Sequence, residues 1–128
     1  MIREVTLEDI QPGAEFYSVF CIAGRPRFDL RHVVCDTGPI VWSDAFTEKD
    51  CVKISFMNGD ERRSDIRSLV DLHIIRRGRQ LTTSYNLHRL FHTKDDAYNY
   101  IGSIMMGTME NPLDQNFLNE TDLARNIR

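Results

Sequence analysis

The stretch that decides the fold is Val52-Lys53-Ile54-Ser55-Phe56-Met57-Asn58-Gly59-Asp60-Glu61-Arg62-Arg63-Ser64-Asp65-Ile66. Apolar side chains at 52, 54 and 56 alternate with their neighbours, which is the period-two pattern of a half-buried strand. The Asn-Gly pair that follows tolerates the positive φ angles of a tight turn and is a strong hairpin signal. The stretch therefore predicts a β-hairpin whose return strand, 61–66, presents Arg62 and Arg63 near its start.

Strand-forming composition recurs on both sides of this hairpin. Aromatic and β-branched residues are frequent in 14–22 and 28–35, and a short third run begins at Ile40. Gln11-Pro12-Gly13 precedes the first run and is a turn signal, because proline pre-sets φ. Downstream of the hairpin we predict a turn at 68–71 and strands at 72–75 and 81–85.

A helix is predicted after the strands, at about 94–106. Thr93-Lys94-Asp95-Asp96 resembles a capping box with aspartate in place of the usual glutamate. Ala97, Tyr100 and Ile104 then recur at helical spacing, and Gly107 stands where a C-cap glycine belongs. Large apolar side chains are few beyond this point. We expect one β-rich domain over 1–107 and a loose C-terminal tail over 108–128, partly helical near 120–127.

The composition is that of a soluble domain. The chain has 128 residues, of which 41% are hydrophobic and 27% charged. The hydrophobic fraction is large enough for a core, and the charged fraction is too low to indicate disorder of the whole chain. Its longest apolar runs span a few residues, far short of the ~20 that a membrane-spanning helix needs. The first residues carry acids where a secretory signal is apolar. We expect a cytoplasmic protein with no membrane segment.

Charge is distributed unevenly along the chain. The formal net charge of −3 disfavours a protein that coats nucleic acid through bulk electrostatics. Residues 62–92, however, hold seven arginines against two aspartates. The planar guanidinium suits bidentate contacts with phosphate or carboxylate and is common at interfaces. The segment is therefore the candidate binding surface, and the plain alternative is a solvated basic face balanced by the acidic N-terminal half.

The cysteines give little support for thiol chemistry. Cys21, Cys35 and Cys51 are widely spaced, and no C-x-x-C motif occurs. None lies in a glycine-rich elbow or at an evident helix start, where a thiolate nucleophile is activated. We expect buried, reduced thiols that behave as small hydrophobic side chains.

Metal and cofactor chemistry is also weakly indicated. His88 and His92 share one face of a helix or strand, so they could hold a metal with Asp95 or Asp96. These two acids fit better in the first turn of the predicted helix. Neither a phosphate-binding loop nor a dinucleotide glycine fingerprint occurs. We predict no catalytic residues, no metal and no cofactor; a metal- or thiol-dependent enzyme is the second alternative.

Two segments carry a resemblance to known families. The alternating strand, Asn-Gly turn and charged return strand of residues 52–66 resemble the central hairpin of SH3-like barrels of the Tudor and KOW kind. Residues 90–97 resemble the strand-to-helix ending of small bacteriophage proteins. The resemblance implies an α+β, mainly β fold: a small SH3-like β-barrel over about 14–75, followed by one C-terminal helix and a loose tail. It implies a binding module and does not identify the ligand.

The predicted function is non-catalytic binding through residues 62–92. We expect a small phage-type protein that binds a host protein of the transcription or defence machinery, because arginines beside aromatic rings suit protein interfaces. The alternative is an SH3-like or KOW-type reader of DNA or RNA that works mainly through phosphates. A homodimer through apolar tail residues such as Phe117 and Leu118 also stays open. The predicted binding residues are Arg62, Arg63, Arg67, Arg76, Arg77, Arg79, Arg89 and Tyr85.

Overall fold

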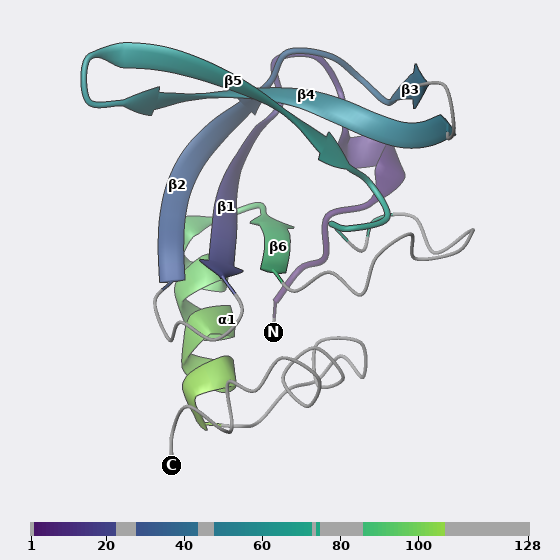
Figure 1. Ribbon diagram of the computed structural model, residues 1–128. Coiled ribbons are helices and arrows are strands. Elements are labelled where there is room, and N and C mark those ends of the chain that lie inside the picture. The colour runs from purple at the N-terminus through teal and green to yellow at the C-terminus, as the bar shows by residue number, and fades with distance from the viewer. Residues whose placement is uncertain (1, 23–27, 44–47, 73, 75–85, 107–128) are drawn as a thin grey trace.

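A computed structural model of the chain describes residues 2–22, 28–43, 48–72, 74 and 86–106 (Figure 1). Within these ranges the fold is mainly β with one C-terminal α-helix, which confirms the predicted fold class. The elements in chain order are the 3-10 turn η1 (Leu7–Asp9), β1 (Glu15–Ile22), β2 (Phe28–Cys35), β3 (Ile40–Ser43), β4 (Glu48–Asn58), β5 (Glu61–Ser68), β6 (Asn86–Phe91) and α1 (Lys94–Met106).

The six strands of the described ranges belong to one antiparallel sheet. β6 pairs with β1, β1 with β2, and β2 with β4. Cys51 of β4 is paired with both Ile40 of β3 and Ser68 of β5, so these two strands lie on opposite edges of β4. β2 and β3 therefore share one edge of β4, and β5 occupies the other.

The sheet bends so that the β4–β5 hairpin crosses over β1, β2 and β6 (Figure 1). Strand side chains alternate between the two faces, and the inner face of each layer supplies the core. This arrangement buries a single apolar cluster between the layers. Its buried members are Val5, Ile10, Phe16, Val33, Cys35, Val52, Ile54, Leu69, Leu72 and Leu90.

The predicted hairpin is confirmed. β4 and β5 pair from Cys51↔Ser68 to Asn58↔Glu61, and Gly59 adopts a φ of 65° in the turn between them. Glycine suits this position because it has no Cβ to clash at positive φ. The structure extends β4 back to Glu48, beyond the alternating run, because its first residues pair with β3.

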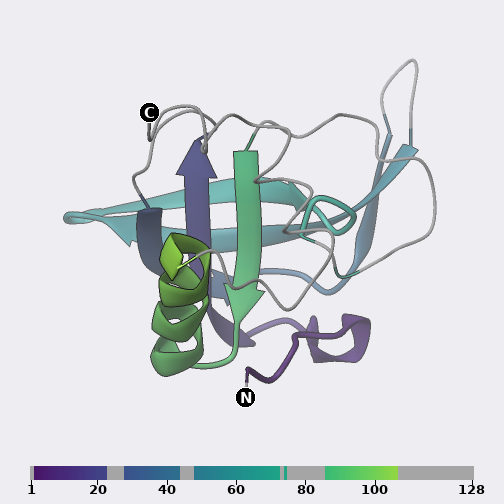
Figure 2. The same ribbon diagram turned by 90° about the horizontal axis from the view of Figure 1, so that it is seen from below.

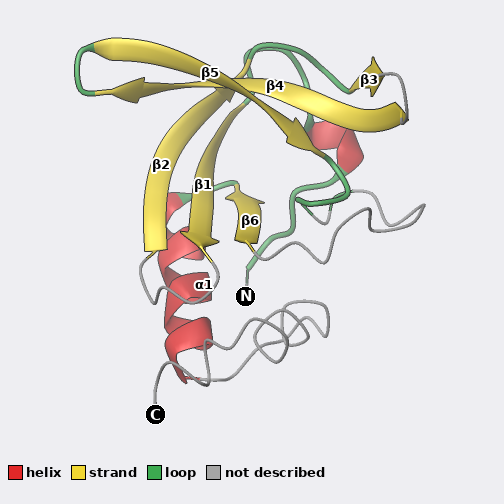
Figure 3. Ribbon diagram, viewed as in Figure 1, coloured by secondary structure: helices red, strands yellow, loops and turns green. Residues whose placement is uncertain are grey.

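Helix α1 covers the outer face of the β1, β2 and β6 layer (Figures 2 and 3). Its bounds confirm the prediction, and the Asp96 N–H donates to Thr93 Oγ1 at 3.1 Å, as expected for a capping threonine. No helix in the described ranges is long and apolar enough to cross a membrane. The helix closes a second buried cluster, made of Val19, Cys21, Phe91, Ala97, Tyr100 and Ile104.

The predicted strand at 72–75 is wrong at its two described residues, Leu72 and Ile74. The Leu72 N–H donates to the Ser68 carbonyl at 3.1 Å, and the Ile74 N–H donates to the Leu69 carbonyl, so the chain turns back after β5. The turn predicted at 68–71 is thereby confirmed, and it buries Leu69 and Leu72 together beneath the hairpin. The predictions for 81–85 and for the tail at 108–128 lie outside the described residues.

Candidate binding groove

β2 and β4 are neighbours over a short distance only. They pair at Val34↔Ser55 and Cys35↔Ile54. Two hollows flank this junction, one between the two layers of the sheet and one on its outer side. We refer to them as the inner hollow and the outer groove.

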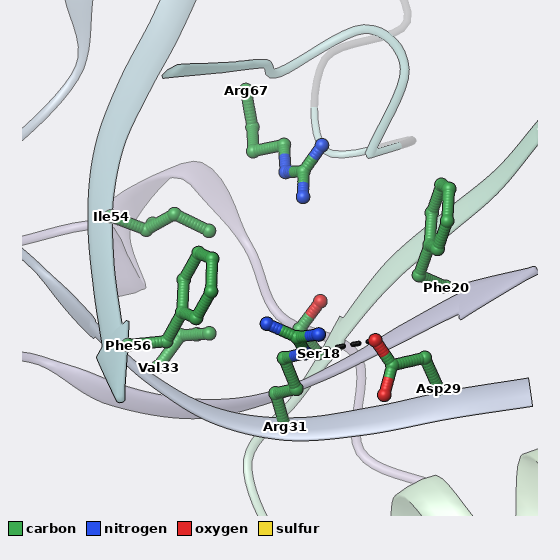
Figure 4. A pocket seen from close by; sticks show the side chains of 8 residues that line it. All are labelled: Ser18, Phe20, Asp29, Arg31, Val33, Ile54, Phe56 and Arg67. Atoms are coloured by element: carbon green, nitrogen blue, oxygen red, sulfur yellow. Dashed lines mark hydrogen bonds and ion pairs between the residues drawn. The ribbon is translucent and has the colours of Figure 1, made fainter. Parts of the chain in front are cut away.

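The inner hollow has a volume of about 170 Å³ (Figure 4). Arg31 of β2 and Arg67 of β5 reach into it from opposite layers, with Phe56 on one side and Phe20 on the other. Alternation explains the placement of Arg31, because odd-numbered residues of β2, such as the core residue Val33, face the inside. The residues that line the hollow are Ser18, Phe20, Asp29, Arg31, Val33, Ile54, Phe56 and Arg67.

The arginine of β2 is held by a carboxylate and an aromatic ring. Arg31 Nε donates to Asp29 Oδ2 at 2.8 Å, two residues away on the same face of the strand. The Arg31 Cζ lies 4.8 Å from the centre of the Phe56 ring, within the range of a cation–π contact. Arg31 therefore joins β2 to the β4–β5 hairpin while its side chain stays 39% exposed.

The arginine of β5 has a similar environment. Arg67 Nη2 lies 3.0 Å from Asp65 Oδ2, and its Cζ lies 5.9 Å from the centre of the Phe20 ring. Phe20 in turn packs on His88 of β6. Burial, and next the positive charge of Arg67, lowers the pKa of His88 to about 4. The His88 imidazole behind Phe20 is therefore neutral and lies within the electrostatic influence of the Arg67 guanidinium.

The outer groove is larger and more apolar, with a volume of about 670 Å³. At its rim, Arg62 Nη2 donates to Asp36 Oδ1 at 3.2 Å and to Ser55 Oγ at 3.4 Å. The Ser55 hydroxyl also donates to Asp36, so the three side chains form one network where β2 leaves β4. The residues that line the groove are Leu30, Arg31, His32, Val34, Ser55, Phe56, Met57 and Arg62.

Arginines of the hairpin have carboxylates close by. Arg62 is paired with Asp36, and Arg67 with Asp65, each at 3.2 Å or less. Residues 48–68 hold five basic and five acidic side chains, so the hairpin as a whole is neutral. Each pair has one partly buried and one more exposed partner, and pairs that water still reaches add little stability. Their effect is to weaken the non-specific attraction of this surface for phosphate.

The predicted site residues of the hairpin separate between two faces. Arg62 is at the rim of the outer groove, whereas Arg67 lines the inner hollow. Arg63 follows Arg62 directly and therefore points to the other face of β5, where it lies 3.2 Å from Glu61. The structure thus brings Arg62 and Arg67 to neighbouring hollows, with Arg31 lining both.

Arg89 does not join this surface. It lies opposite Val19 on the face of the sheet that α1 covers, and it is 8% exposed. Its Cζ is 5.5 Å from the centre of the Tyr100 ring and 5.9 Å from that of Phe91. The remaining predicted residues, Arg76, Arg77, Arg79 and Tyr85, lie outside the described part of the chain.

Arg31, Asp29 and Phe56 were not among the predicted site residues. A signal for Arg31 and Asp29 exists in the sequence, since both fall on the same strand face as Val33 and Cys35. Two charged residues on the same strand face as buried apolar residues indicate that the hydrophobic core does not extend to that end of the strand. Their partner Phe56 is contributed by the hairpin and has no such local signal.

The other chemistry considered in the sequence is placed as follows. Cys21, Cys35 and Cys51 are buried, reduced thiols, as predicted, and burial raises the pKa of Cys35 to about 11. His92 Nε2 lies 3.3 Å from Asp9 Oδ2 and near the η1 turn, away from His88. Among residues 2–22, 28–43, 48–72, 74 and 86–106, no group of three potential metal ligands comes together.

Comparison with known proteins identifies the family. No curated protein and no solved structure matches the chain. A family model described as Phage g100-like protein matches residues 4–104, from the segment before η1 through most of α1. The match spans about four-fifths of the 128 residues and includes both hollows. The chain therefore belongs to the Phage g100-like protein family.

Proposed function

We propose that this protein is a non-catalytic binding module of a phage, which binds a host protein of the transcription or defence machinery through an arginine-rich surface. Membership of a phage family supports the phage setting. The observation that carries the proposal is that Arg31, Arg62 and Arg67 line two adjoining hollows together with the rings of Phe20 and Phe56. Arginine and aromatic side chains are enriched at the energetic centres of protein interfaces.

The SH3-like resemblance is part of the same proposal. With β3 left aside, the order of neighbouring strands is β6-β1-β2-β4-β5. The chain passes through β1, β2, β4 and β5 as a meander, and β6, the last of these strands in the sequence, pairs with β1. The sheet bends over itself (Figure 1). Such an arrangement supports a small SH3-like barrel with its binding surface at the junction between layers.

A protein partner is favoured over nucleic acid by the charge balance of the hairpin. The neutral hairpin and the carboxylates beside Arg31, Arg62 and Arg67 reduce the long-range attraction that phosphate binding needs. Fixed guanidinium–carboxylate pairs instead offer directional partners for polar groups of another protein. The basic segment that extends beyond the hairpin keeps nucleic acid as the competing outcome.

Affinity capture from host-cell lysate tests the proposal. The tagged protein is presented with and without nuclease at two salt concentrations, beside two charge-reversal variants. Arg62→Glu changes the rim of the outer groove, whereas Arg3→Glu makes the same change beside the start of α1. We expect a host protein to be captured even after nuclease treatment. Arg62→Glu should capture about tenfold less of it than Arg3→Glu does.

Two results would replace this proposal. Recovery that disappears with nuclease and with moderate salt would make the protein a nucleic-acid reader. Capture that is equal for Arg62→Glu and Arg3→Glu, and that also survives reversal of Arg76, Arg77 and Arg79 to glutamate, would exclude the arginine-rich surface as the site.

A further inference from the structure

One edge of β2 is largely unpaired within the described residues. β2 pairs with β1 along its length, from Cys21↔Phe28 to Glu15↔Val34. On its other edge it pairs with β4 only at Val34 and Cys35. Residues 28–33 therefore run beside the outer groove and the inner hollow without a described strand on that side.

The hydrogen bonds of Cys35 establish which backbone groups face this open edge. Its N–H donates to the Ala14 carbonyl and its carbonyl accepts from the Gly13 N–H, both at 2.8 Å, so Cys35 is directed to the β1 side. Neighbouring residues of a strand point their backbone groups to opposite edges. Leu30 and His32 therefore direct their N–H and C=O groups toward the side from which β4 has diverged.

The two hollows lie on the two faces of this edge. The outer groove presents Leu30, Val34 and Met57, and the inner hollow presents Arg31 and Arg67. Side chains of a strand added to the edge would alternate between these two environments. One set would lie on apolar surface, and the other would enter a cavity lined by guanidinium groups.

The charge of the lining indicates what the second set should be. The inner hollow, which this second set would enter, is lined by two arginines, Arg31 and Arg67, and by a single carboxylate, that of Asp29. On the other face of the edge, at the rim of the outer groove, the Arg62 side chain is 68% exposed and has N–H groups beyond those that bond Asp36 and Ser55. An incoming carboxylate fits this lining and an incoming ammonium group does not.

We infer that residues 28–33 of β2 are a docking edge for an extended segment of a partner protein in which apolar and acidic side chains alternate. The segment adds a strand beside β2, with Leu30 and His32 supplying the backbone hydrogen bonds. This inference rests on the proposed function, since it names the kind of segment that the host partner supplies. Inward-pointing charges on an edge strand otherwise serve to discourage such pairing, and that is the competing explanation of Asp29 and Arg31.

A backbone-directed variant tests the inference. His32→Pro removes one N–H from the open edge, while His32→Val removes the same imidazole and keeps the N–H. The probe is a fluorescein-labelled peptide of alternating valine and glutamate, followed by fluorescence anisotropy. We expect the peptide to bind His32→Pro about tenfold more weakly than His32→Val, which lacks the same imidazole but keeps the N–H. A peptide of alternating valine and lysine should bind the wild-type protein at least about tenfold more weakly than the glutamate peptide.

Amide hydrogen exchange keeps the test decisive if His32→Pro does not fold. In the wild-type protein, the glutamate peptide should slow exchange at the Leu30 and His32 amides, whereas the Arg31 amide is slow already because it faces β1. Lack of peptide binding to the wild-type protein, or equal binding by His32→Pro and His32→Val, would overturn the inference. Dimerisation of the wild-type protein that His32→Pro abolishes would assign the edge to a second copy instead.

These outcomes separate the inference from the function it rests on. If the host protein is captured through Arg62 yet does not protect Leu30 and His32, the binding module stands and the added strand is wrong. If the peptide binds the edge but no host protein is captured from lysate after nuclease treatment, the docking edge stands and the proposed partner class is wrong.

Discussion

The imidazole of His88 packs against the ring of Phe20, with the two ring centres 4.6 Å apart. His88 Nδ1 is buried and has no hydrogen-bond partner among the described residues. Burial, and next the charge of Arg67, lowers the pKa of His88 to about 4, and Asp65 opposes this only in part. The folded protein therefore keeps this imidazole neutral at pH values where the unfolded chain protonates it.

This difference predicts acid-sensitive stability. Between the ordinary histidine pKa of 6.5 and about 4, the unfolded chain binds a proton that the folded protein does not. The free energy of unfolding should therefore fall by roughly 2–3 kcal/mol as the pH drops through this window, and His88 should add no further loss below it. Urea unfolding at steps between about pH 7 and about pH 4 measures the effect. His88→Leu should remove most of the slope, and an unchanged slope would contradict a buried, neutral His88.

The hairpin and the helix could be predicted because their signals are local. Alternation in β4, the turn at Gly59 and the helical spacing of α1 each depend on residues close together in sequence. The error at Leu72 has a physical reason of the opposite kind. An apolar residue can be buried from a turn as well as from a strand, and the overlying hairpin, formed elsewhere in the chain, decides between them.

The candidate site was less predictable because it depends on non-local pairing. The run of arginines in the sequence does not reveal that Arg89 lies opposite Val19, on the face that α1 covers. Nor does it reveal that Arg62 meets Asp36 across 26 positions of the chain. Strand register and sheet curvature determine both relationships. Neither the register nor the curvature can be read from the sequence of residues 62–92 alone.

A pair of glycine substitutions tests the backbone of the hairpin against that of the helix. Gly59 has a φ of 65°, so Gly59→Ala places a Cβ in the left-handed region and should cost about 1 kcal/mol of unfolding free energy. Gly102 lies in α1, where an added Cβ meets no described atom within 4 Å beyond the neighbouring backbone of the helix, so Gly102→Ala should stabilise by roughly 0.5–1 kcal/mol. Urea unfolding of both variants provides the comparison. Destabilisation by Gly102→Ala would show that the helix packs more tightly there than the structure has it.

Thiol labelling tests the core around the cysteines. Cys35 is 1% exposed and its pKa is raised to about 11 by burial and by the neighbouring Asp36, while Cys21 and Cys51 are also buried. At pH 8 only about a thousandth of the Cys35 thiol is ionised, so a thiolate-selective reagent should react very slowly with the folded protein. We expect three labelled cysteines per chain in denaturant and almost none without it. Rapid labelling of one thiol in the folded protein would identify a reactive cysteine and revive the thiol-enzyme alternative.

The last prediction separates a structural arginine from a surface arginine. Arg89 is 8% exposed between β6 and α1, with the Tyr100 ring 5.5 Å from its Cζ, whereas Arg63 is 54% exposed on its side chain beside Glu61. Arg89→Ala should lower the free energy of unfolding by roughly 1–3 kcal/mol, because it removes a long stem packed under the helix and leaves the ring without its cation. Arg63→Ala should stay within about 0.5 kcal/mol of the wild-type protein. Urea unfolding measures both, and capture of the partner by folded Arg89→Ala should match that of the wild-type protein. A binding defect in Arg89→Ala at full stability would instead return Arg89 to the binding surface and require α1 to move away from the sheet.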